Sequence, residues 1–432
     1  MPTPRTALLL ALGASLALAA VARPGIGLAV LALDLALVAA VAVDLLRAPR
    51  PGSVEASRSM REPLSAFAEN RIEIRLAARG GRSVVLDLAD APPAAFDARG
   101  HRERLRLPAD GRLAMAYAVV PRERGIHAFG DLHLRARGPW GLAARQWRIP
   151  LARPVRVYPD LRGLAAAEGA GLPAPGAVGR RGLVEGREFA SLRPYHPGDD
   201  VRAVDWKATA RLGAPVVREY VPERDQTLWL LLDCGRHLAA RLGDGRTKLD
   251  HAVDAALALA RAALARGDRV GCLLFGAEVD RAVAPGRGSA HLGPLAGALF
   301  LARARVEESD YALAFDALQA RQTRRALVAV FTDLADPDTS ALLLARAAAL
   351  RGRHLPWVVA VADSAVADAA RAVPATPPEA YVRLAAERIL AERELAAARL
   401  QAAGVWVLSV PARELAGAVV AGYLDVKARG RL

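Results

Sequence analysis

Two long apolar runs near the start of the chain constrain its fold more than any other feature. Residues 6–22 carry no charge, residues 26–46 are almost entirely Ala, Leu and Val, and Arg23-Pro24-Gly25 separates the two. At about 1.5 Å per helical residue, the first run extends about 25 Å and the second is long enough for a hydrocarbon core of about 30 Å. The pattern predicts two membrane-spanning helices joined by a tight turn, over residues 1–50.

The alternative for the first run is a cleavable secretory signal. Ala20-Val21-Ala22 fits the small-residue pattern of a cleavage site, whereas Arg5 alone makes a poor charged start. If cleavage occurred, the second run would still anchor the chain. Asp34 is costly in the middle of that run, so we expect it to be protonated or paired within the hairpin, or to contact another copy. Asp44 lies close enough to the end of the run to reach the membrane boundary.

Arginines follow the second run more densely than they precede it. Arg47, Arg50, Arg58 and Arg61 come after it, and the turn offers only Arg23. Basic residues next to membrane spans stay in the cytoplasm. We therefore expect a two-span inner-membrane protein whose soluble body is cytoplasmic.

The net charge of +14 does not by itself indicate a nucleic-acid partner. Only three lysines occur, and no long basic block or aromatic-basic stripe accompanies the arginines. We expect no nucleic-acid binding. Cys234 and Cys272 lie in apolar runs without a CxxC partner, so we expect buried thiols rather than a disulfide or metal site.

After a short polar linker, residues 51–160 show the alternation of β-strands. Runs at 70–77, 83–89, 102–107, 112–120, 127–137 and 145–159 have period two or are short and apolar, with turn signals between them. Short strands at this spacing predict an antiparallel β-sandwich.

Cations and carboxylates alternate densely near residues 186–225. Trp206 stands among these charges, as a buried aromatic anchor would. The arginines Arg193, Arg202, Arg211 and Arg218 can pair with Asp199, Asp200, Asp205 and Glu219. Two interpretations stay open: an ion-pair network that joins two domains, or a docking surface for a partner or ligand.

This stretch resembles the signature of the bacterial family called domain of unknown function 58, which runs close to E-F-x-x-L-R-x-Y-x-P-G-D-D-x-R-x-I-D-W-x-x-x-A-R. The matching residues are Glu188, Phe189, Leu192, Arg193, Tyr195, Pro197, Gly198, Asp199, Asp200, Arg202, Asp205, Trp206, Ala210 and Arg211. Residues 124–142 resemble a second family segment ending D-P-x-G-L, with Gly138 in place of Asp. With the hairpin and the C-terminal region, the resemblance extends over nearly the whole chain. It implies a membrane-anchored accessory protein that acts with MoxR-type AAA+ ATPases, and other membrane-associated proteins, in complex assembly or chaperoning.

Strands and helices alternate over residues 226–432. Apolar strands at 228–234, 269–276, 326–334, 357–362 and 405–410 are separated by helices, among them 248–266, 309–321 and 378–402; the glycine-rich run 286–293 reads as a loop. This order predicts a mostly parallel sheet with both faces covered. Asp233 and Asp333 end two strands, at the edge where such sheets bind ligands.

The element order resembles a von Willebrand factor A domain. We therefore expect a multidomain chain: a transmembrane helical hairpin (1–50), an antiparallel β-sandwich (51–160), a linker with the charged signature (161–225) and a Rossmann-like, von Willebrand factor A-like α/β domain (226–432). The resemblance places the family's metal site at Asp233, Gly235, His237, Ser309 and Asp333. Gly235 and His237 replace two serines, so the site is degenerate. We expect at most weak divalent-cation binding, with Asp233 and Asp333 held by backbone amides or an arginine.

No catalytic motif accompanies these carboxylates. The sequence lacks a Walker A loop, a G-x-S-x-G elbow and H-E-x-x-H, and a Cys234–His237 pair lacks a third orienting group. We predict a non-enzymatic scaffold or adaptor without a cofactor. The alternative is a cytoplasmic-face hydrolase or transferase that uses Asp233, His237 and Asp333.

Overall fold

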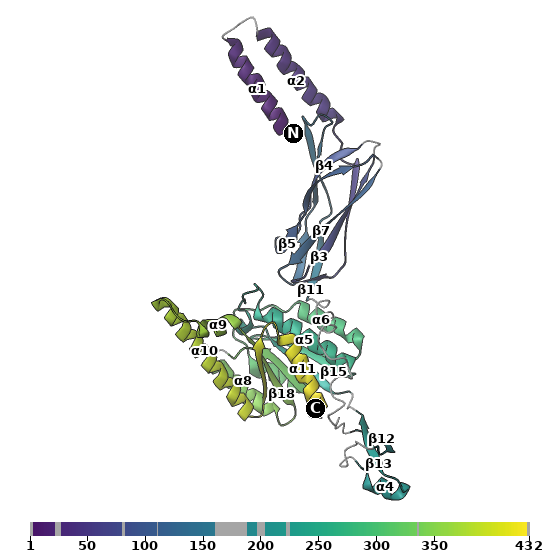
Figure 1. The fold of residues 1–432 in the computed structure, drawn as a ribbon, viewed down its shortest axis with the longest axis vertical. Coiled ribbons are helices and arrows are strands. Elements are labelled where there is room, and N and C mark those ends of the chain that lie inside the picture. Colours follow the sequence, from purple (N-terminus) through teal and green to yellow (C-terminus); the bar gives the residue numbers. More distant parts are fainter. Residues whose placement is uncertain are drawn as a thin grey trace. The chain divides into compact units, whose positions relative to one another are not determined.

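The computed structural model describes residues 3–21, 27–79, 83–109, 111–159, 188–196, 204–221, 225–334 and 337–429. Its contacts divide the chain into two compact units, Met1–Tyr158 and Pro159–Leu432. Figure 1 shows the elements of both units. The hairpin and the β-rich region share the first unit.

Two apolar helices, α1 (Pro4–Val21) and α2 (Gly27–Arg47), lie side by side at the start of the first unit (Figure 1). Of the described helices, α2 alone is long and apolar enough to cross a membrane, and the apolar stretch counted in α1 is shorter. Asp34 of α2 faces α1, since a Cβ added to Gly13 would meet its carboxylate. Asp34 therefore lies inside the hairpin.

The polar end of the hairpin is bound to the turn at residues 138–143. The Asp44 carboxylate accepts three backbone N–H hydrogen bonds of 2.8 Å, from Trp140, Leu142 and Ala143. Thr3 donates its hydroxyl to the Gly141 carbonyl at 2.7 Å. Asp44 is fully buried and its partners are protein amides, and its position near the membrane boundary stays a prediction.

The remainder of the first unit is built from β-strands around one apolar core. Its sheets have the orders β1-β3-β7-β5, β10-β9-β4-β6 and β2-β11-β8, and their pairings are antiparallel except for β2 with β11. The strands are β1 (Val54–Met60), β2 (Leu64–Ser65), β3 (Asn70–Ala78), β4 (Val84–Ala89), β5 (Phe96–Arg99), β6 (Arg102–Leu107), β7 (Arg112–Pro121), β8 (Gly125–Phe129), β9 (Leu132–Arg137), β10 (Ala144–Ile149) and β11 (Arg153–Tyr158).

The structure divides two of the predicted strands and adds three, which are β1, β2 and β5. Gly130 and Asp131 separate β8 from β9 within 127–137, and the segment around Pro150 separates β10 from β11 within 145–159. Proline cannot donate to a strand ladder, and glycine weakens a strand interior. The expected polar linker contains β1, whose polar residues conceal its pairing with β3.

Arg58 on β1 is buried, although we expected it to flank the membrane. Its guanidinium forms an ion pair with Asp90, and the two side chains are 1% and 0% exposed. It also donates to the carbonyl oxygens of Leu151 and Gly130, at 2.8 and 2.9 Å.

The second unit contains a six-stranded sheet in the order β16-β15-β14-β17-β18-β19. Its pairings are parallel except that β16 runs antiparallel to β15 at one edge. The strands are β14 (Thr227–Asp233), β15 (Arg269–Phe275), β16 (Val279–Gly286), β17 (Leu327–Thr332), β18 (Leu355–Ala362) and β19 (Trp406–Pro411). The four central strands are almost completely buried, as expected for a sheet covered on both faces.

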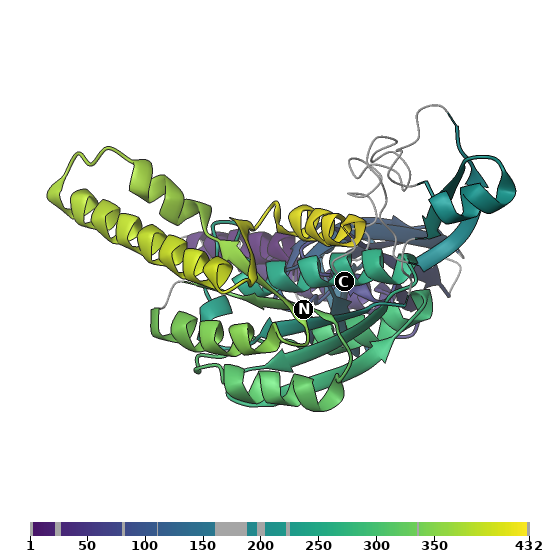
Figure 2. The ribbon, with the colours of Figure 1, turned by 90° about the horizontal axis from the view of Figure 1, so that it is seen from below.

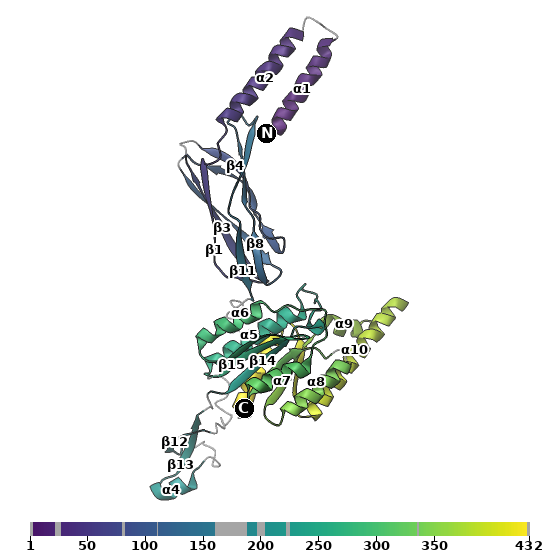
Figure 3. The same cartoon turned by 180° about the vertical axis from the view of Figure 1, so that it is seen from behind.

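Helices cover both faces of this sheet (Figures 2 and 3). One layer contains α5, α6 and α11, and the other contains α7, α8 and α10. The run 286–293 that we expected to be a loop instead enters η4 and α6, which follow edge strand β16. The helices are η3 (Arg236–Leu238), α5 (Lys248–Ala265), η4 (Ser289–His291), α6 (Leu292–Phe300), α7 (Tyr311–Arg321), α8 (Pro337–Leu350), α9 (Ser364–Arg371), α10 (Pro377–Ala402) and α11 (Leu415–Ala428).

Candidate functional site

The two predicted strand-end carboxylates lie at the same edge of the sheet. β14 ends at Asp233, and Asp333 directly follows β17. These strands are parallel neighbours with Leu232 opposite Phe331, so both strands end at the same edge of the sheet. Ser309 and Tyr311 reach this edge from the start of α7.

The Asp233 carboxylate is surrounded by donors from its own fold. Its Oδ2 accepts hydrogen bonds of 2.7 Å from the hydroxyls of Tyr311 and Thr332. Its Oδ1 accepts from the Gly235 N–H at 2.8 Å and from the Ser309 hydroxyl. Burial and the adjacent Asp233 charge hold the pKa of the Tyr311 phenol well above its usual range, so Tyr311 stays a donor.

Asp333 lies between two cations. Its Oδ2 accepts from Lys248 Nζ and from Arg393 Nη2, the latter at 2.9 Å, and its Oδ1 accepts from the Leu334 N–H. The side chains of Asp333, Lys248 and Arg393 are 4%, 5% and 11% exposed. A buried carboxylate between two buried cations is an internal salt bridge, in which the carboxylate partly offsets the burial of both cations. Nε and Nη1 of Arg393 have no hydrogen-bond partner among the described residues.

This donor set does not fit a hard divalent cation. Mg²⁺ requires several oxygen ligands in near-octahedral geometry, whereas Asp233 already binds protein donors and Asp333 binds two cations. Position 235 has no room for a serine, because a Cβ on Gly235 would overlap the Ser309 hydroxyl. Within the described ranges, no group of three or more His, Cys, Asp or Glu side chains is arranged to hold a metal.

The residues of the alternative, enzymatic interpretation do not form a relay in the part of the chain that the structure describes. His237 Nε2 lies 3.6 Å from Glu308 and contacts neither aspartate. Cys234 is fully buried, and its thiol donates to the Leu232 carbonyl. A general base needs access to the proton that it removes, and a thiol nucleophile needs access to its substrate. The arrangement of His237 and the burial of Cys234 do not suit these roles.

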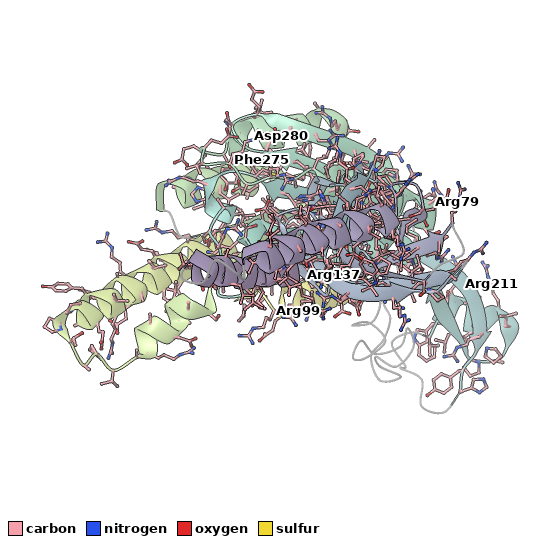
Figure 4. The ribbon with its side chains drawn as sticks, turned by 90° about the horizontal axis from the view of Figure 1, so that it is seen from above. Arg79, Arg99, Arg137, Arg211, Phe275 and Asp280 are labelled. Atoms are coloured by element: carbon pink, nitrogen blue, oxygen red, sulfur yellow. The ribbon has the colours of Figure 1, made fainter. Side chains whose placement is uncertain are left out.

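The described signature residues fall in a small module formed by β12 (Glu188–Pro194), α4 (Trp206–Leu212) and β13 (Val216–Val221). Arg193 is the penultimate residue of β12, and Tyr195 directly follows the strand. Arg211, labelled in Figure 4, lies in the last turn of α4. Gly198, Asp199, Asp200 and Arg202 lie outside the described residues, as does Pro197. The proposed ion-pair network therefore stays a prediction.

Two described signature residues have roles that we did not predict. Asp205 caps α4, accepting hydrogen bonds of 3.0 Å from the N–H groups of Lys207 and Ala208. Trp206 is 66% exposed, so the expectation of a buried anchor is wrong. α4 buries none of its residues, which leaves the indole on its surface.

Sequence analysis missed four residues of the strand-end site: Tyr311, Thr332, Lys248 and Arg393. Thr332 directly precedes Asp333, and Lys248 begins a helix whose Thr247–Asp250 capping box is visible in the sequence. Tyr311 lies two residues after Ser309. For Arg393 there was no such signal, because α10 carries many exposed arginines of the same appearance.

The region that contains the signature is similar to a known protein family. Residues 191–372 match the family described as "Protein of unknown function DUF58". These residues are similar to the DUF58 family. The DUF58 match runs from β12 to α9 and confirms the family resemblance there, whereas residues 1–190 lie outside it.

Curated relatives share the DUF58 region at moderate identity. Over 157 residues the chain is 34% identical to the uncharacterised protein Rv1480 of Mycobacterium tuberculosis, covering 35% of this chain and 48% of that protein. It is 28% identical over 123 residues to the uncharacterised protein YeaD of Bacillus subtilis, covering 28% of this chain and 31% of YeaD. The chain spans about half the length, or less, of these curated relatives.

Solved structures align only loosely with the chain. A conserved hypothetical protein, BatB, from Bacteroides thetaiotaomicron aligns over 47% of this chain and 99% of its own, at 10% identity and a TM-score of 0.30. A FixG-related protein from Vibrio parahaemolyticus aligns over 24% and 96%, at 7% identity and a TM-score of 0.18. These scores are too low to establish a shared fold.

Proposed function

We propose that this protein is a membrane-anchored adaptor that acts with a MoxR-type AAA+ ATPase and does not itself catalyse a reaction. The observation that carries this proposal is the state of the strand-end carboxylates. Asp233 accepts from three hydroxyls and one amide, and Asp333 binds Lys248 and Arg393. Carboxylates engaged in this way stabilise a domain, which suits a binding scaffold. The nature of the partner comes from the family resemblance.

The α/β domain is proposed to be of the von Willebrand factor A type. Its strand order and its antiparallel edge strand β16 support this assignment, as do the helical layers on both faces. In this proposal the metal-binding edge has been replaced by internal hydrogen bonds and salt bridges. Partner recognition would then not require a metal-bridged acidic residue.

The signature module is the proposed docking surface. Trp206 and Leu212 of α4 are 66% and 62% exposed, and the helix also carries Lys207 and Arg211. Tryptophan and arginine are enriched among the residues that dominate binding energy at protein interfaces. An exposed indole among cations suits a partner surface with an apolar pocket and acidic rim.

The membrane anchor is proposed to be a two-helix hairpin with the soluble body in the cytoplasm. The hydropathy of α2 supports one span, and the hydrogen bonds of Thr3 and Asp44 to one turn support a hairpin whose two ends lie together. The proposed cytoplasmic orientation rests on the arginines that follow α2: Arg47, Arg50, Arg58 and Arg61.

The test is affinity capture with the full chain, tagged at its C-terminus and solubilised in mild detergent. Mass spectrometry should identify an AAA+ ATPase in the captured material. Trp206→Ala should lose the ATPase, while Tyr381→Ala, at a 75% exposed aromatic of α10, should retain it. A purified chain that hydrolyses or transfers a substrate by itself, and loses that activity in His237→Ala, would overturn the proposal in favour of the enzyme.

A further inference from the structure

A cavity lined by arginines lies beside the end of α2, within the first unit. Its volume is about 380 Å³, and its lining includes Arg47, Arg79, Arg106 and Arg137 with the hydroxyl-bearing Ser53 and Ser83. Among the described residues, no carboxylate lines it. Figure 4 labels Arg79 and Arg137. Four guanidinium groups around one cavity favour an anionic occupant.

The pairing of these arginines leaves the cavity positively charged. Arg137 donates Nη2 to Asp87 at 3.1 Å, but its Nε is buried and has no hydrogen-bond partner among the described residues. Arg79 pairs with Glu55, and both side chains are more than half exposed, so that pair contributes little. Arg47 lies 5.6 Å from the centre of the Trp140 ring, and no described carboxylate pairs with Arg106. The lining of the cavity therefore has more hydrogen-bond donors than there are acceptors nearby.

The position of the cavity indicates the source of the anion. Arg47 is the last residue of α2, so a spanning α2 would bring the cavity to the level of the lipid phosphates. Trp140 is 48% exposed beside it, and Val85, which lines it, is 39% exposed. Tryptophan is enriched at membrane–water interfaces, and basic pockets beside membrane helices suit anionic headgroups.

We propose that this cavity binds the phosphate of an anionic phospholipid headgroup. Arginine forks form paired hydrogen bonds to phosphate oxygens, and the Ser83 hydroxyl can donate to a remaining headgroup oxygen, whereas the Ser53 hydroxyl already donates to the Arg50 carbonyl at 2.8 Å. The inference rests on the membrane anchor of the proposed function, but not on the adaptor role or on the ATPase. A soluble phosphate ester shares the same chemistry and is the competing occupant.

The test uses the full chain in a non-ionic detergent, delipidated and then titrated with phosphatidylglycerol or with phosphatidylcholine of the same acyl chains. Native mass spectrometry measures the bound lipid. Phosphatidylglycerol should bind, and Arg79→Gln/Arg106→Gln should weaken its binding at least about tenfold. The matched control is Arg148→Gln/Arg156→Gln, which removes two charges from strands β10 and β11 outside the cavity and should change binding less than twofold.

Three results would overturn the inference. They are equal binding of the two lipids, equal loss in both double variants, and displacement of phosphatidylglycerol by low millimolar glycerol 1-phosphate, which would assign the site to a soluble ester. Fractionation of cells, done separately, distinguishes failure of the lipid site from failure of the proposed membrane anchor. A chain that stays in washed membranes but shows no preference for phosphatidylglycerol retains the anchor and loses the lipid site. A chain found in the soluble fraction loses both.

Discussion

The carboxylate of Asp44 occupies the space that a side chain at Gly138 would need. A Cβ added to Gly138 would overlap all three heavy atoms of that carboxylate group, which accepts the backbone N–H groups of Trp140, Leu142 and Ala143. The related family segment has Asp at this position, so a carboxylate from the turn itself would be available there. In this chain α2 supplies the carboxylate instead, and the hairpin is thereby joined to the β domain.

The first prediction concerns two variants, Asp44→Ala and Gly138→Asp, which move the carboxylate from α2 to the turn. Asp44→Ala leaves three buried N–H groups without their acceptor and should lower the free energy of unfolding by about 3 kcal/mol or more. Gly138→Asp alone should also destabilise, because its side chain meets Asp44. The double variant should be more stable than either single variant, since the turn then holds its own carboxylate. Thermal unfolding in detergent measures this, and additive losses in the double variant would contradict it.

The second prediction concerns the salt bridge around Asp333. Asp333→Ala leaves Lys248 and Arg393 buried without their carboxylate, and this should cost about 3–5 kcal/mol. Asp316→Ala is the control, because Asp316 is 66% exposed and lies 3.9 Å from Arg346; it should cost less than about 0.5 kcal/mol. Denaturant unfolding of both variants measures these losses. A loss in Asp333→Ala as small as that in Asp316→Ala would mean that Asp333 does not stabilise the domain.

The third prediction is that the strand-end site binds no Mg²⁺ tightly. Asp233 and Asp333 already accept hydrogen bonds from protein donors, and Gly235 supplies no ligand. Calorimetric titration of the full chain in detergent with MgCl₂ and MnCl₂ should show no saturable binding at low micromolar concentration. Saturable binding that disappears in Asp233→Ala would show that the site exchanges its internal donors for a cation.

The fourth prediction separates the two interpretations of the signature. Asp205→Ala removes the cap of α4 and should cost about 1 kcal/mol, while Asp205→Asn keeps a side-chain acceptor and should cost less. A loss of about 3–5 kcal/mol in both variants would instead indicate a buried charge network. If both variants fold normally and only partner capture changes, the docking interpretation is supported.

The fifth prediction concerns the orientation of the hairpin. Because Arg47, Arg50 and Arg61 follow α2, alkaline phosphatase fused after Leu432 should be inactive and a fluorescent protein there should be bright. Alkaline phosphatase fused after Gly25, between the two apolar runs, should be active and provides the control. An active phosphatase at residue 432 would place the body outside the cytoplasm.

The positions of the strand-end residues were predictable, whereas their partners were not. Apolar runs such as LWLLLDC identify a buried strand and its last residue, so Asp233 and Asp333 could be placed at one edge before the structure was known. Arg393 comes from a helix 60 residues further along the chain, and no local pattern fixes which of its faces meets the sheet. Arg58 shows the same limit, because a charge on a strand suggests solvent until its buried partner is known.

The hydrogen bonds between the hairpin and the β domain join segments that are made at different times. Asp44 emerges from the ribosome about 100 residues before the turn at 140–143, and Thr3 earlier still, so the interval is at least roughly 5–20 s at bacterial elongation rates. β11, which pairs with both β2 and β8, emerges later still. In the proposed anchor, the helices would therefore be free to enter the bilayer while their polar ends still lack a protein partner. Insertion would then precede domain closure, so the β domain would complete its folding at the membrane surface.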